Sequence, residues 1–166
     1  MIYWITNKFR KEKDMKNKVD NVLRYIINNY PYPDELSKTR TTKLIYLVDW
    51  KSVQKTGHQI TEIEWYFDHY GPYVSDVFDT ADEDSEIRIS EKVSNFGTKK
   101  YIVESKLSKE KLRCELSSEE SDIIDEVIDE TKFLSWNAFI DFVYATPPIV
   151  QSEKYGFLDL KKLANS

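Results

Sequence analysis

The chain has 166 residues and a formal net charge of −5, with 40% hydrophobic, 14% aromatic and 32% charged residues. This length and composition predict one domain that buries its own core, because chains of this size fold without disulfides or metals. They argue against a membrane-spanning protein, since no apolar run approaches the roughly 20 residues of a transmembrane helix. Cys114 is the single cysteine and has no partner for an internal disulfide. The start, MIYWITNKFRKEKDMKNK, lacks the layout of a secretory signal, so we expect a cytoplasmic protein without a membrane partner.

Charge is unevenly distributed along the chain. Residues 1–18 carry a balance of +4, which leaves about −9 for the remainder. The six bases of this stretch are Lys8, Arg10, Lys11, Lys13, Lys16 and Lys18. Residues 1–14 are therefore predicted to be a basic N-terminal extension, followed by a single domain over residues 15–166. Such an extension either contacts an anionic partner or is simply solvated. The acidic body argues against extensive contact with nucleic acid phosphates, so we expect no nucleic acid partner or only an indirect one.

Two helices are predicted before residue 60. Apolar residues recur at helical spacing over residues 19–30, and Pro31 ends the pattern. A second helix is predicted to begin near Ser37 or Thr39 and to end at Gly57, a residue type that favours the left-handed conformation of a helix stop.

The segment WYFDHYGPY, residues 65–73, combines five aromatic residues with a histidine and a Gly-Pro pair. Gly71 and Pro72 are expected to turn the chain into a short helix over about residues 74–80, because proline is favoured near helix starts. The remaining aromatic surface suits either the core or a protein interface. The predicted orientation is inward for Trp65 and Phe67 and outward for Tyr66 and Tyr73.

The apolar spacing changes from helical to alternating over residues 87–107, which predicts an antiparallel β-hairpin. Gly97 supplies the positive φ that a tight connection requires. The side chains predicted to face inward are Ile87, Ile89 and Val93 on the first strand and Tyr101, Val103 and Leu107 on the second.

Helical spacing returns in the C-terminal part of the chain. Ser117 and Glu120 have the spacing of a capping box. A further helix begins at Ser135, with Trp136, Phe139, Ile140 and Val143 as its predicted buried stripe, and residues 146–148 (TPP) end it. The predicted fold is mainly α (α+β): a compact helical domain with an inserted antiparallel β-hairpin.

The residues offer little for catalysis. His58 and His69 do not have the spacing of metal ligands, and neither nucleophile motifs nor a phosphate-binding glycine loop occurs. Cys114 lies beside both Arg113 and Glu115, so no electropositive setting activates its thiol. We therefore expect no catalytic residue, no metal, no cofactor and no enzyme activity. An enzyme built around His69 and nearby carboxylates is the catalytic alternative.

Two acidic stretches invite a comparison with metal sites. Residues 76–86 (DVFDTADEDSE) contain six acids but lack the glycine of a calcium-binding loop. Residues 115–130 contain eight acids and no base. On a helix these acids form either a solvated face or a surface complementary to a basic protein.

Residues 43–73, KLIYLVDWKSVQKTGHQITEIEWYFDHYGPY, resemble the core of the SocA-like antitoxin family, whose characteristic domain is called Panacea. The pattern is a KLxYLxD-type helix followed by glycine, IT, an aromatic stretch with tryptophan, and Tyr-Gly-Pro. The matching residues are Lys43, Leu44, Tyr46, Leu47, Asp49, Gly57, Ile60, Thr61, Trp65, Tyr70, Gly71 and Pro72. Residues 146–149 (TPPI) also resemble the closing element of the family, so the likeness extends from about residue 19 to about residue 160.

The resemblance implies an antitoxin of a toxin–antitoxin pair, often found in prophages, that neutralises its toxin by direct stoichiometric contact. The implied partner is a toxin protein encoded by an adjacent gene. Contact or its support is expected from Trp65, Tyr66, Tyr70 and Tyr73. For Lys43, Tyr46 and Asp49, structural support and toxin contact are equally open. The alternative is a winged-helix-like DNA-binding regulator of a prophage or toxin–antitoxin operon, in which the predicted hairpin acts as the wing.

Overall fold

The computed structural model describes residues 2–165, and for residues 11–16 only the backbone. It is mainly helical with small antiparallel sheets, which confirms the predicted fold class. The helices are α1 (Ile2–Asn29), α2 (Lys38–Thr56), α3 (Asp76–Glu83), α4 (Ser118–Thr131), α5 (Trp136–Tyr144), α6 (Pro147–Val150) and α7 (Leu160–Ala164), with a 3-10 turn at Pro33–Glu35. The strands are β1 (Tyr66–Asp68), β2 (Gly71–Tyr73), β3 (Ile87–Val93), β4 (Lys99–Ser105) and β5 (Gly156–Phe157). Among these helices, none combines the length and apolar composition that crossing a membrane requires.

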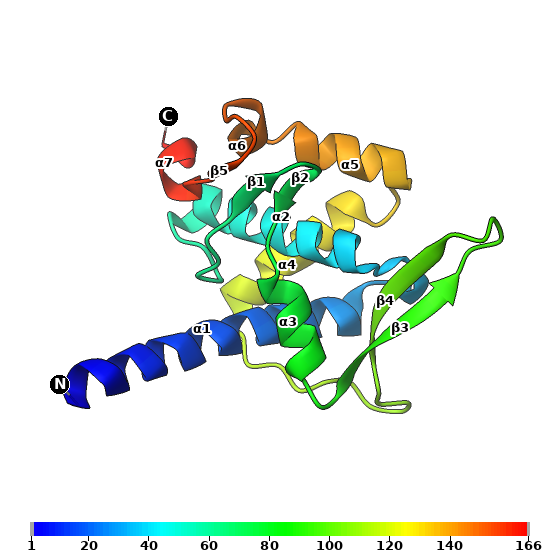
Figure 1. Cartoon of the computed structure of the whole chain (residues 1–166), viewed down its shortest axis with the longest axis horizontal. Helices are drawn as coiled ribbons and strands as arrows, with labels where there is room; N and C mark the ends of the chain where they lie inside the picture. Colours follow the sequence, from blue (N-terminus) through cyan, green and yellow to red (C-terminus); the bar gives the residue numbers. More distant parts are fainter. Residues whose placement is uncertain (1, 166) are drawn as a thin grey trace.

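Helix α2 runs through the middle of the molecule, between α1 and the β1–β2 hairpin (Figure 1). The Ser37 side chain caps its first turn by accepting a hydrogen bond from the backbone N–H of Arg40. Gly57 ends the helix with a φ of 80°. Both predicted ends are confirmed. Because other elements surround α2, most of its residues are buried, including the polar Lys43 and Asp49.

Helix α1 has two different halves. From Val19 onward its apolar residues pack into the core, with Ile27 only partly buried, which confirms the predicted helix. Its N-terminal part projects from the body of the molecule (Figure 1) and exposes Trp4 and Phe9. The predicted boundary at residues 14 and 15 lies within this continuous helix, since no glycine or proline precedes Pro31 to interrupt it. The side chains of Lys11, Lys13 and Lys16 lie outside the described part of the structure.

The expected turn into a helix at Gly71 and Pro72 is wrong. These residues belong to β2, which pairs with β1 in antiparallel register, Phe67 opposite Pro72. Strand β5 joins the other side of β1, so the sheet order is β2-β1-β5. Pro72 is tolerated because β2 is an edge strand. Helix α3 begins later, at Asp76.

The hairpin of β3 and β4 is confirmed, with Gly97 at a φ of 79°. It projects from the helical body (Figure 1). Ile87 and Val103, near the body, are buried as predicted. Val93 and Tyr101 are exposed, contrary to the prediction, because the distal half of the hairpin extends beyond the core that would have covered them.

The C-terminal elements close the core. The capping box of Ser117 and Glu120 is present at the start of α4, and Ser135 caps α5. Helix α5 ends before Pro147, as predicted, and Pro147 is also the first residue of the short α6, a position that proline favours. The tail then adds β5 to the sheet and packs Leu160 of α7 into the core.

Candidate functional site

The residues that match the family pattern come together around the β1–β2 hairpin. Lys43, Tyr46 and Asp49 lie on one face of α2, at intervals of three residues, and this face is turned toward residues 61–73. All three side chains are buried, as are Thr61 and Trp65. Apart from Tyr70, which is exposed, the polar and aromatic residues of the pattern thus form a buried framework.

Asp49 attaches the chain before β1 to α2. Its carboxylate accepts hydrogen bonds from the backbone N–H of Thr61 at 2.9 Å and from the Trp65 indole N–H at 2.9 Å. The Thr61 hydroxyl and the Gln59 amide also donate to it. Burial raises the pKa of Asp49 to about 6, although these donors act in the opposite direction. One carboxylate therefore orients a stretch of seven residues, from Gln59 to Trp65.

Lys43 holds the turn of the hairpin. Its ammonium group donates to the backbone carbonyl of Tyr70 at 2.8 Å and to that of Pro72 at 3.3 Å. Burial lowers the pKa of Lys43 to about 8, and the negative charge of Asp68 partly offsets this effect. The amine thus acts as a structural donor to the backbone.

Tyr46 and Gly71 connect the hairpin to the C-terminal helices. The Tyr46 hydroxyl shares a hydrogen bond of 2.8 Å with the Thr146 hydroxyl, and its ring meets Trp65 edge to face at 5.5 Å. Burial raises the pKa of Tyr46. Gly71 has a φ of 94°, and a Cβ atom placed there would lie 3.2 Å from the Tyr144 ring. The hairpin is thus fixed to α2 and to the α5–α6 region.

The outer face of the sheet carries a row of aromatic side chains. Tyr66 lies opposite Tyr73 on one side and Phe157 on the other, and the Tyr66 and Phe157 rings meet edge to face at 5.3 Å. Tyr73 is 43% exposed and Phe157 is 73% exposed. The predicted orientations are confirmed, with Trp65 and Phe67 inward. Because Trp65 is fully buried, it supports this face and does not form part of it.

Tyr70 lies at the turn between β1 and β2 and is also exposed. Its ring packs edge to face against His69, and the His69 Nδ1 atom lies 3.1 Å from the Tyr155 hydroxyl. His69 therefore participates in a surface aromatic cluster. Its backbone N–H donates to the Asp68 carboxylate, but among the described residues no carboxylate is bonded to its ring.

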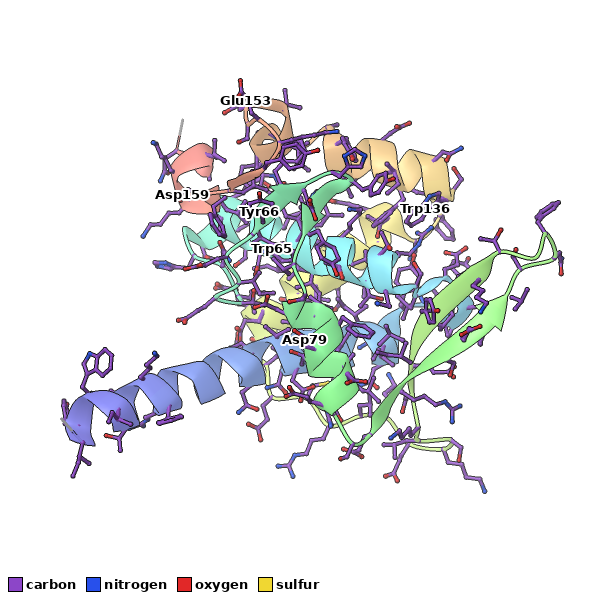
Figure 2. All side chains as sticks on the ribbon, viewed as in Figure 1. Trp65, Tyr66, Asp79, Trp136, Glu153 and Asp159 are labelled. Atoms are coloured by element: carbon purple, nitrogen blue, oxygen red, sulfur yellow. The ribbon has the colours of Figure 1, made fainter. Side chains whose placement is uncertain are left out.

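Tyr73 lies between two concave surfaces. On the sheet side, a hollow of about 390 Å³ is lined by Tyr66, Phe157 and the acids Glu62, Glu64 and Asp76. On the other side, a groove of about 660 Å³ separates the body from the β3–β4 hairpin. Figure 2 shows Tyr66 on the sheet and Trp136 at the end of α5 that lies nearest this hairpin. We refer to these surfaces as the acidic sheet face and the hairpin groove.

The hairpin groove has no local sequence motif. Its aromatic walls come from four separate elements of the chain, so no local motif contains them. They are Tyr73, Phe78, Tyr101 and Trp136. Trp136 was predicted to be buried, yet it is 45% exposed because it occupies the first turn of α5, at the rim of the groove.

Cys114 and several acids of the two acidic stretches are bonded to other side chains. Asn28 donates to the Cys114 sulfur, and burial raises the pKa of this thiol, which disfavours a nucleophilic thiolate. In the first acidic stretch, Asp84 accepts two hydrogen bonds from Arg24. In the second, Glu126 and Glu130 form ion pairs with lysines of α2. Within residues 2–165 as described, no three His, Cys, Asp or Glu side chains are grouped for metal binding.

The fold and this site define a helical domain with a firmly attached hairpin, whose outer face is exposed. The model of the family described as antitoxin SocA-like, Panacea domain, matches residues 42–148. The chain therefore belongs to this family, and its role is that of an antitoxin with a protein partner. Neither the curated proteins nor the solved structures contain a significant match.

Proposed function

We propose that this chain neutralises one cognate toxin, encoded by an adjacent gene, through a stoichiometric protein–protein complex. The observation that carries the proposal is the aromatic row of Tyr66, Tyr73 and Phe157 on the outer face of the sheet. Lys43 holds the turn of the β1–β2 hairpin in place, and Asp49 holds the chain that leads into it. A rigid surface loses little conformational entropy on binding, and exposed aromatic residues are frequent anchors of protein interfaces. Tyr70, at the adjacent turn, extends the same surface.

The proposal assigns no catalytic step to the chain. Residues 15–166 form the antitoxin domain in this proposal, and residues 1–14 are a basic extension of α1. Neutralisation then depends on the amount of antitoxin relative to toxin, because each toxin molecule must be covered. This stoichiometric behaviour distinguishes binding from enzymatic inactivation of the toxin.

Co-expression with the neighbouring reading frame tests the proposal. Expression of the neighbouring gene alone is expected to stop growth, and this chain is expected to restore growth and to copurify with the toxin at a fixed ratio. The double variant Tyr66→Ala/Tyr73→Ala is expected to lose protection, whereas Tyr3→Ala, at the projecting end of α1, retains it. A neighbouring gene that is harmless alone, or that stays lethal with the wild-type chain, would contradict the proposal.

The charges of the β3–β4 hairpin, which would act as the wing, do not favour the DNA-binding alternative. Its cations are largely engaged with acids: Arg88 with Glu104, Lys92 with Asp34 and Lys99 with Glu91. An electrophoretic shift of the upstream DNA, steeply weakened by salt, would favour this alternative.

A further inference from the structure

The hairpin groove has the form and composition of a binding site for a protein segment. The N-terminal end of α2, the β3–β4 hairpin, α3 and the first turn of α5 enclose it. Tyr73, Tyr101 and Trp136 each expose between 43% and 45% of their surface around it. Half-exposed Trp and Tyr side chains around a concave surface are the residues that dominate binding energy in protein interfaces. Because Tyr73 also belongs to the acidic sheet face, the groove continues the surface proposed to contact the toxin.

The groove is locally positive in a chain of net charge −5. Lys38, Lys99 and Lys100 line it together with a single acid, Glu35, and of these lysines Lys99 is also paired with Glu91 of β3. The Lys38 ammonium lies 3.5 Å from the centre of the Phe78 ring and 5.6 Å from that of Tyr101. Among the described residues Lys38 forms no ion pair, so aromatic faces hold its charge in place without neutralising it. This charge is available to a carboxylate.

The outer edge of β4 forms part of the groove wall. At its end near the body, the backbone N–H of Val103 donates to the carbonyl of Leu36, and Ser37 forms an isolated bridge with Ile102. Toward the tip, within the described residues, residues 99–101 pair only with β3. An extended chain lying in the groove can add to this edge through backbone hydrogen bonds.

We propose that the hairpin groove binds an extended segment of the toxin in which a carboxylate lies next to a large aromatic or aliphatic side chain. The apolar side chain packs against Tyr73, Tyr101 and Trp136, and the carboxylate approaches Lys38. This inference rests on the proposed function. A protein segment fits better than a nucleic acid strand, because Glu35 lines the groove and would repel a phosphate backbone that passes it.

Peptide selection tests the chemistry of the groove without the toxin. A phage-displayed library of random dodecapeptides is selected on the purified full chain. The selected peptides are expected to combine Asp or Glu with Trp, Phe, Tyr or Leu, and to bind less tightly as salt is raised. Lys38→Glu is expected to weaken them about tenfold. It leaves the helix intact, because an acid is favoured in the first turn of α2.

Lys111→Glu, in the exposed segment before α4, is the matched control and is expected to bind the peptides like the wild type. Selection of basic peptides, or equal binding by Lys38→Glu and Lys111→Glu, would overturn the inference. Binding of oligothymidylate that is lost in Lys38→Glu would also overturn it, since the groove would then accept nucleic acid.

The toxin provides a separate result. If the wild-type chain neutralises the toxin and both Lys38→Glu and Trp136→Ala neutralise it equally well, the groove inference fails while the proposed function stands. If the wild-type chain does not neutralise the toxin, the proposed function fails, and the toxin is not the occupant. Loss of protection in Lys38→Glu, with protection retained in Lys111→Glu, supports both.

Discussion

The inner and outer sides of residues 61–73 perform different tasks. Inward, Thr61 and Trp65 bond to a buried carboxylate of α2. Outward, Tyr66 and Tyr73 form a row on the sheet surface. The residues by which the chain resembles its family lie almost entirely on the inner side or in α2 beneath it. The family pattern therefore describes how the hairpin is held, whereas the outward side chains are those that the proposed function assigns to toxin contact.

The largest effect is expected for Asp49→Ala. The substitution leaves the N–H groups of Thr61 and Trp65 and the Thr61 hydroxyl buried without their acceptor. Unfolding free energy is expected to fall by about 3–5 kcal/mol, because each unsatisfied buried donor costs about 1–3 kcal/mol. Denaturant unfolding measures the change.

Two further variants calibrate this result. Asp49→Asn preserves the shape and one acceptor oxygen, so a smaller loss of about 1–2 kcal/mol is expected. Asp141→Ala, an exposed acid on α5, is expected to change stability by less than about 0.5 kcal/mol. If Asp49→Ala and Asp141→Ala were equally stable, the hydrogen bonds of Asp49 on the inner side would not stabilise the fold.

Gly71→Ala is expected to cost about 2 kcal/mol. At a φ of 94° an alanine is strained, and its Cβ atom would press on the Tyr144 ring at 3.2 Å. Gly97→Ala is the matched control, because its φ of 79° is similar but no atom lies within 4 Å of the added Cβ. It is expected to cost about 1 kcal/mol. Thermal unfolding of the two variants separates the close approach from the backbone strain; identical losses would rule out a contribution from Tyr144.

The lowered pKa of the buried Lys43 amine predicts that the free energy of unfolding depends on pH. Its pKa is about 8 in the folded chain and 10.5 in the reference state, so the folded chain holds fewer protons between these values. Stability of the wild type is therefore expected to rise from pH 8 to pH 10 relative to Lys43→Met, by at most about 1.4 kcal/mol per pH unit. Urea unfolding of both proteins over this range measures the difference, and parallel profiles would contradict the buried amine.

The smallest effect on stability is expected on the outer side. Tyr66→Ala/Tyr73→Ala is expected to lower unfolding free energy by only about 1 kcal/mol, since both side chains are partly exposed. Its affinity for the toxin is nevertheless expected to fall by more than about tenfold. Titration calorimetry with the purified toxin, alongside Tyr3→Ala, measures the loss; a large loss of stability with unchanged affinity would reverse the assignment of the two sides.

Local patterns predicted the helices well. Ser37 and Gly57 at the ends of α2, and Ser117 with Glu120 at the start of α4, act through residues close in sequence. The three-stranded sheet could not be anticipated in the same way. Strands β1 and β2 contain three residues each, and β5 contains two.

By itself, the sequence determined the helical class, the β3–β4 hairpin and the membership of an antitoxin family, because apolar periodicity, caps and motifs are local properties of the chain. Only the tertiary structure decided which motif residues hold the β1–β2 hairpin in place and which residues lie exposed on its surface. It buried Lys43 and Asp49 beneath the hairpin, and it brought Lys38, Tyr101 and Trp136 to one groove. The physical reason is that burial and proximity depend on contacts between residues far apart in the chain, which no local spacing encodes.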